Sequence, residues 1–165
     1  MTITSLRRLV TNGAALTIAW VFVGLLVTSF DNTLAQQPRS GRKAIRPEKV
    51  PNTGLPYTPG ILAGNTLYIS GNLGRDPVSG RLVPGGIEAE TRQSLANIHE
   101  ILRNAGMDFK DVVSVTAYIT DFKTFDKFNA VYREYFPNDP PTRATVQVAG
   151  LNAGAQIELQ MIAVK

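Results

Sequence analysis

Cysteine is absent from the 165 residues of this chain, and histidine and tryptophan occur once each. Without cysteine there can be no disulfide, no thiolate metal ligand and no cysteine nucleophile. The residues around His99, the one histidine, match no catalytic triad or metal-binding spacing. No phosphate loop, dinucleotide fingerprint or His/Asp metal pair is present either. The sequence therefore predicts no metal and no cofactor, and it places His99 on a helix surface.

A basic domain is also missing, although the net charge of the chain is +4. Residues 1–49 hold seven of the 17 Lys/Arg and two of the 13 Asp/Glu, which leaves 10 basic and 11 acidic residues from Val50 onward. A nucleic-acid-binding domain usually carries its own basic face. We therefore expect no nucleic-acid partner. The hydrophobic content of 44% is sufficient for a packed core.

The first 35 residues have the pattern of an export signal. Arg7-Arg8 supplies a positive start, residues 14–27 form an apolar run, and Thr33-Leu34-Ala35 resembles a small-x-small cleavage site. The sequence predicts a signal peptide over residues 1–35, a mature chain that starts near Gln36, and a periplasmic or secreted location.

The same leader is compatible with an uncleaved membrane anchor. Residues 9–30 are long enough to span a bilayer, although Thr11, Asn12 and Gly13 weaken the start of that stretch. An anchored chain would have the membrane as a partner. The arginine pair also suggests the twin-arginine export route, but its flanking residues match that pattern poorly.

Residues 36–53 are polar and basic, with prolines and glycine but no apolar period, so we expect a basic flexible tail. The domain is predicted over residues 54–165. Its patterns predict strands at 66–70, 81–83, 112–120, 145–149 and 157–164, and helices at 87–105 and 121–136.

Both helices have clear start and stop signals. Gly85-Gly86 opens the first, whose apolar positions recur at three- and four-residue steps, and Gly106 ends it. Asp121 can cap the second, which carries an aromatic stripe. The stripe comprises Phe122, Phe125, Phe128, Val131, Tyr132 and Tyr135. In the strand between the helices, alternation predicts that Val113, Val115, Ala117 and Ile119 share one face.

This order of elements predicts an α+β fold, with two helices packed on one face of a mixed β-sheet. The final strands are apolar on one side and only modestly polar on the other, so both faces of the sheet need cover. In so small a domain we expect another copy of the chain to supply it.

Two charged residues stand in the C-terminal strand segments: Arg143 before one strand and Glu158 within the last. Arginine can hold a carboxylate through its planar fork, and a glutamate can manage a proton or a water. On a rigid sheet the pair would suit a small keto or imino acid. The alternative is that both face solvent, which is commoner for charged residues in strands.

An ordered set of segments then resembles the RidA/YjgF family of enamine/imine deaminases, also called the liver perchloric-acid-soluble protein family. The segments are Gly54–Pro59, Leu67–Asn72, Glu90–Ile98, Ala105-Gly106, Asp111–Asp121, Phe128–Phe136, Pro141–Val146 and Ile157–Leu159. Together they cover almost all of the predicted domain, and the leader and tail lie outside the resemblance.

The resemblance implies a chorismate-mutase-like domain that assembles as a homotrimer with clefts between neighbouring subunits. It implies hydrolysis of 2-enamine and 2-imine acids to 2-keto acids and ammonia, without cofactor or metal. The expected ligands are small imino, enamino or 2-keto acids.

The resemblance also assigns the site. Arg143 matches the arginine that holds the substrate carboxylate, and Glu158 matches the acidic residue that positions the attacking water. The implied substrate-binding residues are Tyr57, Ser70, Gly71, Asn72, Arg143 and Thr145.

The chain departs from the family pattern at four positions. Thr145 stands where several members have cysteine, Asn72 where glutamine is common, Gly150 where some have arginine, and Gln160 where a second acidic residue often follows. These departures bear on substrate preference more than on the reaction.

Two other functions compete with the deaminase. A trimer that binds a ligand or acts as a chaperone without catalysis would need neither Arg143 nor Glu158. Ribonuclease activity, reported for some relatives, fits poorly with a near-neutral domain that lacks a histidine acid/base pair.

Overall fold

The computed structural model describes residues 41–50 and 54–165 of the chain. The predicted export signal over residues 1–35 lies outside the described residues, as do residues 36–40 and 51–53 of the predicted tail. Within the described ranges, no helix has both the length and the apolar character needed to cross a membrane.

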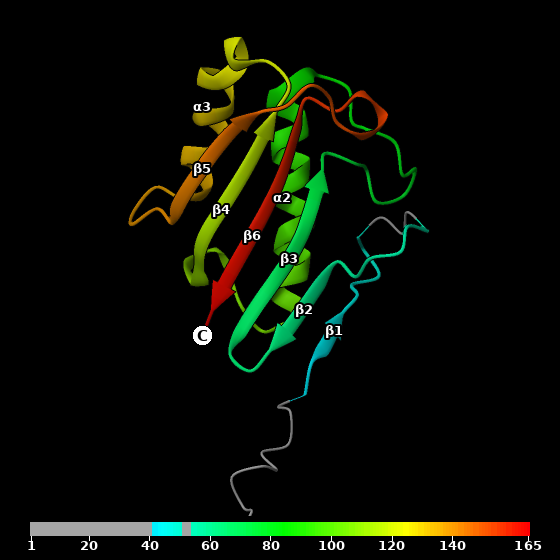
Figure 1. Ribbon diagram of the computed structural model, residues 1–165, viewed down its shortest axis with the longest axis vertical. Helices are drawn as coiled ribbons and strands as arrows, with labels where there is room; N and C mark the ends of the chain where they lie inside the picture. The colour runs from blue at the N-terminus through cyan, green and yellow to red at the C-terminus, as the bar shows by residue number, and fades with distance from the viewer. Residues whose placement is uncertain (1–40, 51–53) are drawn as a thin grey trace, which may run out of the picture. The chain divides into compact units, whose positions relative to one another are not determined.

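Six strands form one mixed sheet in the order β1-β2-β3-β6-β4-β5 (Figure 1). All neighbouring strands are antiparallel except β4 and β5, which run parallel. The strands are β1 (Lys43–Ile45), β2 (Gly60–Ala63), β3 (Thr66–Leu73), β4 (Val112–Ile119), β5 (Thr142–Gln147) and β6 (Ile157–Val164).

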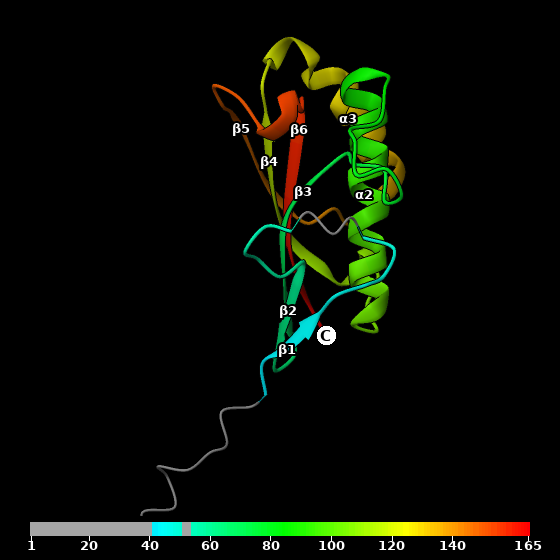
Figure 2. The ribbon, with the colours of Figure 1, turned by 90° about the vertical axis from the view of Figure 1, so that its right-hand side faces the viewer.

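Two α-helices, α2 (Gly86–Asn104) and α3 (Phe125–Tyr135), lie on the same face of this sheet (Figure 2). The connections within residues 54–165 contain the short 3₁₀ helices η2 (Phe109–Asp111), η3 (Phe122–Thr124) and η4 (Asn152–Gly154). The predicted α+β class, with a mixed sheet and two helices on one face, is confirmed.

Helix α2 follows the predicted pattern. Ile87, Leu95, Ile98 and Leu102 recur on one face and are buried in the core. The glycines at its ends are needed for their backbone conformation, since Gly85 and Gly106 have φ values of 115° and 70°. The helix packs against β3 and β6.

The aromatic stripe of α3 is shorter than predicted. Asp121 caps the 3₁₀ turn η3, because its side chain accepts a hydrogen bond from the Lys123 backbone N–H. Phe122 lies in that turn and is exposed, whereas Phe128 and Tyr132 are buried in the core. The stripe therefore starts effectively at Phe125.

The predicted flexible tail is wrong for residues 43–45. These residues form β1, which pairs with β2, and Ile45 is only 3% exposed. The sheet therefore begins before residue 54. The predicted strand at 81–83 is reduced to one bridge between Arg75 and Leu82.

Strand β4 carries an irregularity that changes one expected side chain. The register of β4 against β6 shifts between Val112 and Ser114. Such a bulge reverses the alternation locally. Val112 is therefore buried and Val113 is 45% exposed, so the expected face of Val113 is wrong, while Val115, Ala117 and Ile119 are buried as predicted.

The sheet face opposite the helices, called the open face below, carries large exposed side chains. Tyr68 pairs with Ile162, and Val146 pairs with Tyr118, which in turn pairs with Glu158. Tyr68 and Val146 are 51% and 44% exposed. No helix of the described chain covers this face (Figure 2).

Candidate active site

A pocket of about 360 Å³ lies beside the C-terminal half of β3. Strand β2 pairs with β3 only as far as Ile69, so Ser70 to Leu73 extend beyond it. The lining residues come from β3, β6, α2 and three loops. They are Val50, Leu55, Tyr57, Pro59, Ser70, Gly71, Asn72, Leu73, Arg75, Asn97, Asn152, Glu158 and Gln160. The volume is within the range of small-molecule sites, about 300–1,000 Å³.

A bulge in β3 shapes the floor of this pocket. Ile69 pairs with Met161 and Asn72 pairs with Leu159, so β3 has one more residue than β6 between these pairs. Such an extra residue bends the strand and redirects side chains. Ser70 and Gly71 occupy the bulge and both line the pocket.

Glu158 packs directly against Gly71. A Cβ atom at position 71 would overlap Glu158 Oε1 and lie 2.8 Å from its Cδ. Only glycine leaves room for the carboxylate in this position. Gly71 therefore has a steric role in the site.

The Glu158 carboxylate is uncommitted. It makes no hydrogen bond or ion pair with another residue of the described ranges. Burial raises the pKa of Glu158 above its ordinary value, because desolvation disfavours the charged form. A half-buried carboxylate without a partner is suited to bind water or exchange a proton with a ligand.

Hydrogen bonds fix the walls of the pocket. Ser70 Oγ donates to the Thr58 carbonyl oxygen at 2.7 Å and ties the Tyr57 loop to β3. Asn72 Nδ2 donates to the Ser70 carbonyl oxygen at 2.9 Å, and Ser94 Oγ donates to the Asn72 carbonyl oxygen at 2.8 Å. The bulge is thus anchored to α2 on one side and to the Tyr57 loop on the other.

Arg143 does not line this pocket. Its guanidinium lies over the rings of Tyr132, Phe128 and Phe125, at 4.5, 5.0 and 5.8 Å from their centroids. Arg143 Nη2 also donates to Asn129 Oδ1 at 2.8 Å. Cation–π contacts and this hydrogen bond hold the side chain against α3.

The Tyr132 phenol, which lies beneath the Arg143 guanidinium, stays neutral. Burial raises the pKa of Tyr132 to about 12, although the nearby Arg143 opposes the rise. The Tyr132 hydroxyl is buried and has no hydrogen-bond partner among the described residues. Among the described residues, the environment of Arg143 therefore contributes aromatic faces and one amide, but no anion.

Strand register places Arg143 and Glu158 on opposite faces of the sheet. Arg143 pairs with Val115, which pairs with Met161, and side chains of directly paired residues share a face. Val115 and Met161 are buried beneath the helices. Glu158 lies three residues from Met161 on β6, so it points the other way.

Thr145 is on the helix side as well, since it pairs with Ala117, which pairs with the buried Leu159. One copy of the chain therefore brings together Tyr57, Ser70, Gly71, Asn72 and Glu158 of the predicted site. It does not bring Arg143 or Thr145 to them. The expectation that Arg143 and Glu158 form a site together is not met within a single copy.

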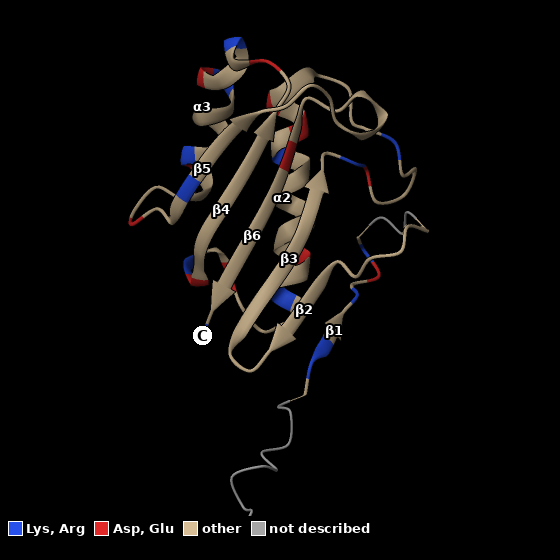
Figure 3. Ribbon diagram, in the orientation of Figure 1, with Lys and Arg blue, Asp and Glu red and all other residues tan. Residues whose placement is uncertain are grey.

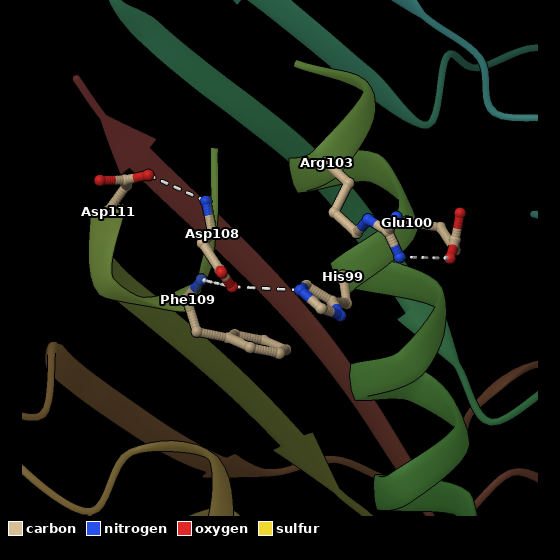
Figure 4. Close-up of polar contacts among 6 residues, drawn as sticks. All are labelled: His99, Glu100, Arg103, Asp108, Phe109 and Asp111. Atoms are coloured by element: carbon tan, nitrogen blue, oxygen red, sulfur yellow. Dashed lines mark hydrogen bonds and ion pairs between the residues drawn. The ribbon is translucent and has the colours of Figure 1, made fainter. Parts of the chain in front are cut away.

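His99 does not line the pocket. Its side chain reaches from α2 toward Asp108 and Phe109 (Figure 4). Its ring stacks on Phe109 with centroids 5.0 Å apart, and its Nε2 is 3.1 Å from Asp108 Oδ1. The prediction of a helix-surface residue is confirmed. The hydrogen bond that the Phe109 backbone N–H donates to Asp108 lowers the pKa of Asp108.

Charged side chains are sparse on the strands and concentrated on helices and loops (Figure 3). In the described part of the chain, no cluster of three His, Cys, Asp or Glu side chains could hold a metal ion. The described pocket offers one carboxylate and one guanidinium, from Glu158 and Arg75, among neutral side chains.

Sequence reasoning missed three polar residues of the pocket: Arg75, Asn97 and Asn152. Arg75 and Asn152 belong to turn regions, whose three-dimensional paths the sequence pattern does not reveal. Asn97 is one of four polar residues on the buried side of α2, with Glu90, Thr91 and Ser94, and the sequence pattern alone does not single it out among them. Asn129, which binds Arg143, stands directly after the buried Phe128 and was also missed.

Comparison with known proteins agrees with this fold. Residues 47–165 match the family described as Endoribonuclease L-PSP. A 2-iminobutanoate/2-iminopropanoate deaminase of Bos taurus is 47% identical over 124 residues, which cover 75% of this chain and 90% of the bovine protein. A RutC family protein of Sulfurisphaera tokodaii is 43% identical over 118 residues, covering 72% of this chain and 94% of that protein.

Solved structures give the same result. The crystal structure of RidA from the Antarctic bacterium Psychrobacter sp. PAMC 21119 is similar with a TM-score of 0.72 and 35% sequence identity. The match covers 75% of this chain and 100% of that one.

Proposed function

This chain belongs to the endoribonuclease L-PSP (RidA/YjgF) family, and from that premise we propose that it hydrolyses 2-imino and 2-enamino acids to 2-keto acids and ammonia. Relatives such as the bovine protein carry the name 2-iminobutanoate/2-iminopropanoate deaminase. The observation that carries the proposal is the Glu158 carboxylate, which lies unpaired and partly desolvated against Gly71 in a pocket of substrate size.

The chemistry needs little beyond orientation and one base, because an imine carbon is already electrophilic. Glu158 orients a water and accepts its proton as the oxygen bonds to the imine carbon. The imine nitrogen takes up a proton to complete the carbinolamine. The carbinolamine hydroxyl then loses its proton as the C=O bond forms, and the nitrogen gains a second proton as the C–N bond breaks and ammonia leaves. An enamine first takes a proton at carbon to become the imine. No oxidant or reductant is needed.

The substrate carboxylate is assigned to Arg143 of a second copy. Arg143 lies on the edge strand β5 and faces the helices, whereas Glu158 faces the open side, so one copy cannot direct both at one small molecule. The exposed Tyr68 and Val146 give the open face the apolar character of a surface that another copy covers. We propose a homotrimer with one pocket at each subunit boundary.

The family description also names an endoribonuclease, and this is the second candidate. RNA cleavage commonly uses a histidine acid/base pair and a basic surface. His99 instead contacts Asp108 and does not line the pocket, whose described lining residues include one cation and one anion. We therefore rank the deaminase first.

We also propose that the mature chain acts outside the cytosol. The support is the pattern of residues 1–35, and the first described strand, β1, begins at Lys43, so cleavage near Gln36 would leave the sheet intact. N-terminal sequencing of protein from its native host decides the matter. An intact Met1 in a soluble cytosolic fraction contradicts export, and an intact Met1 in membranes favours the anchor.

The deaminase itself is tested with freshly generated 2-iminobutyrate and 2-iminopropionate. We expect the purified protein to accelerate release of 2-oxobutyrate and pyruvate over the spontaneous rate. A short RNA incubated with the same preparation should remain intact. No acceleration by a folded, assembled protein would favour the non-catalytic, ligand-binding alternative.

A further inference from the structure

The pocket contains two opposite charges that do not pair with each other. Among its described lining residues, Arg75 is the one cationic side chain and Glu158 the one anionic side chain. The ion pairs formed within the described ranges do not include either residue. An unpaired guanidinium in a substrate-sized pocket is a ready partner for an anionic group of the ligand.

Arg75 is held in place by hydrogen bonds at both its side chain and its backbone. Its Nη1 donates to the Gly80 carbonyl oxygen at 2.7 Å, and its Nη2 donates to Asn152 Oδ1 at 3.0 Å. The Arg75 carbonyl oxygen accepts a hydrogen bond from Asn97 Nδ2 at 2.9 Å. Asn97 is almost fully buried and is itself held by Gln93. The guanidinium is therefore preorganised at the pocket wall.

These contacts leave donors unused. A guanidinium has five N–H groups, and the two side-chain contacts of Arg75 are both to neutral oxygens. Neutral acceptors do not compensate its charge, whereas a carboxylate can do so and accept two parallel hydrogen bonds. The remaining donors of Arg75 thus match a second carboxylate, at the end of a substrate side chain.

We propose that Arg75 makes this enzyme selective for imines of acidic amino acids, whose side chains end in a carboxylate. The inference rests on the proposed deaminase function. The 2-carboxylate binds Arg143 of a second copy, the imine carbon lies beside Glu158, and the side-chain carboxylate binds Arg75. Apart from Glu158, the described lining residues supply no anion that would repel the second carboxylate.

The test compares 2-iminoglutarate with 2-iminobutyrate, each generated from its amino acid by an oxidase. For the purified wild-type protein we expect a higher kcat/KM with the acidic imine. Arg75→Met should lower that value about 10-fold or more while changing the value for 2-iminobutyrate less than about twofold. The matched control is Arg81→Met, because Arg81 is an exposed arginine on the same loop, and it should change neither value.

A binding measurement separates this inference from the deaminase proposal. Calorimetry with 2-oxoglutarate and 2-oxobutyrate needs no turnover, and Arg75→Met should weaken only the binding of 2-oxoglutarate. If the wild type hydrolyses neither imine but shows this selective loss, the deaminase proposal fails and the role of Arg75 stands.

Two results would overturn the role of Arg75. One is an equal loss for both ligands in Arg75→Met, together with a lowered Tm, which would make Arg75 only a brace between Gly80 and Asn152. The other is a wild-type preference for 2-oxobutyrate and 2-iminobutyrate. Arg75→Lys adds a further check, since it keeps the charge and should retain part of the acidic preference.

Discussion

The charged residues on the two faces of the sheet differ in their side-chain contacts. On the helix-covered face, Arg143 is engaged by Asn129 and by three aromatic rings of its own copy. On the open face, Glu158 has no such partner among the described residues, and its carboxylate lies close to Gly71. The cation is thus positioned in advance, and the carboxylate is left available for water and ligand.

This difference separates two requirements of a catalytic site. A binding group gains from being fixed before the ligand arrives, since less entropy is lost on binding. A proton-transfer group gains from an incomplete environment that brings its pKa nearer to neutrality. The sheet keeps the two groups apart within one copy, so assembly would control when they meet.

Removal of the guanidinium is the largest expected effect. Arg143→Ala should cost on the order of 2–5 kcal/mol of transition-state binding, which is a rate loss of roughly 30-fold or more. Arg143→Lys should recover little, because an ammonium cannot form the bidentate fork. The measurement is 2-keto acid release, with circular dichroism and light scattering on the same samples.

A purely structural role for Arg143 predicts a different result. If Arg143 serves only to pack against Tyr132 and Phe128, its removal lowers the Tm or disturbs assembly but leaves turnover per folded assembly unchanged. Full activity in a folded Arg143→Ala protein would remove Arg143 from the site.

A smaller loss is expected from Gly71→Ala, which acts on the carboxylate through sterics alone. The new Cβ would force Glu158 Oε1 to move, and a misplacement of that size should lower kcat about 10-fold. Gly150→Ala is the matched control, because no atom lies within 4 Å of a Cβ built at Gly150. Equal activity in both variants would show that the position of Glu158 does not matter.

The sequence predicted elements well where a pattern was regular. Helix α2 and strand β6 match their predicted residues closely because apolar residues recur at the helical and strand periods. Strand β1 was missed because three residues, Lys43–Ile45, are too few to show alternation within a basic segment. The face of Val113 was wrong because a bulge depends on the partner strand, which local sequence does not contain.

The site could be predicted as a set of residues but not as an arrangement. Strand alternation tells which neighbours of Arg143 share its face, but not how β5 and β6 are registered through β4. That register decides that Arg143 and Glu158 lie on opposite faces. Arg75 was missed for a similar reason, since its contacts with Gly80 and Asn152 join two turns far apart in the sequence.

Coexpression of two inactive variants tests whether Arg143 of one copy and Glu158 of another copy form one site. We expect coexpressed Arg143→Ala and Glu158→Gln chains to form mixed trimers with one intact site each. With random assembly of equal amounts, about one site in four receives both an intact Arg143 and an intact Glu158. The mixture should therefore have about a quarter of the wild-type activity. A mixture no more active than its two parents would mean that each site uses both residues of one copy.

The smallest expected effect is a change in how thermal stability depends on pH when Glu158 or Glu134 is replaced. Burial raises the pKa of Glu158 in the folded protein, whereas Arg92 lowers the pKa of Glu134. The contribution of Glu158 to stability is therefore fully present below the pKa that this residue has in the unfolded chain, and it is lost as the pH rises through its pKa in the folded protein. Glu158→Gln should therefore raise the Tm at neutral pH by about 1–3 °C, and this gain should vanish below about pH 4.

Glu134 supplies the contrast of opposite sign. Its exposed carboxylate binds Arg92, whose hydrogen bond lowers the pKa of Glu134. That contribution is present above the unfolded pKa and lost as pH falls through the folded pKa, so Glu134→Gln should lower the Tm slightly at neutral pH and not in acid. Thermal unfolding of both variants from pH 3 to 8 provides the measurement. If Glu158→Gln followed the sign of Glu134→Gln, the Glu158 carboxylate would have a stabilising partner in the assembled protein, and it would not be free to bind the attacking water.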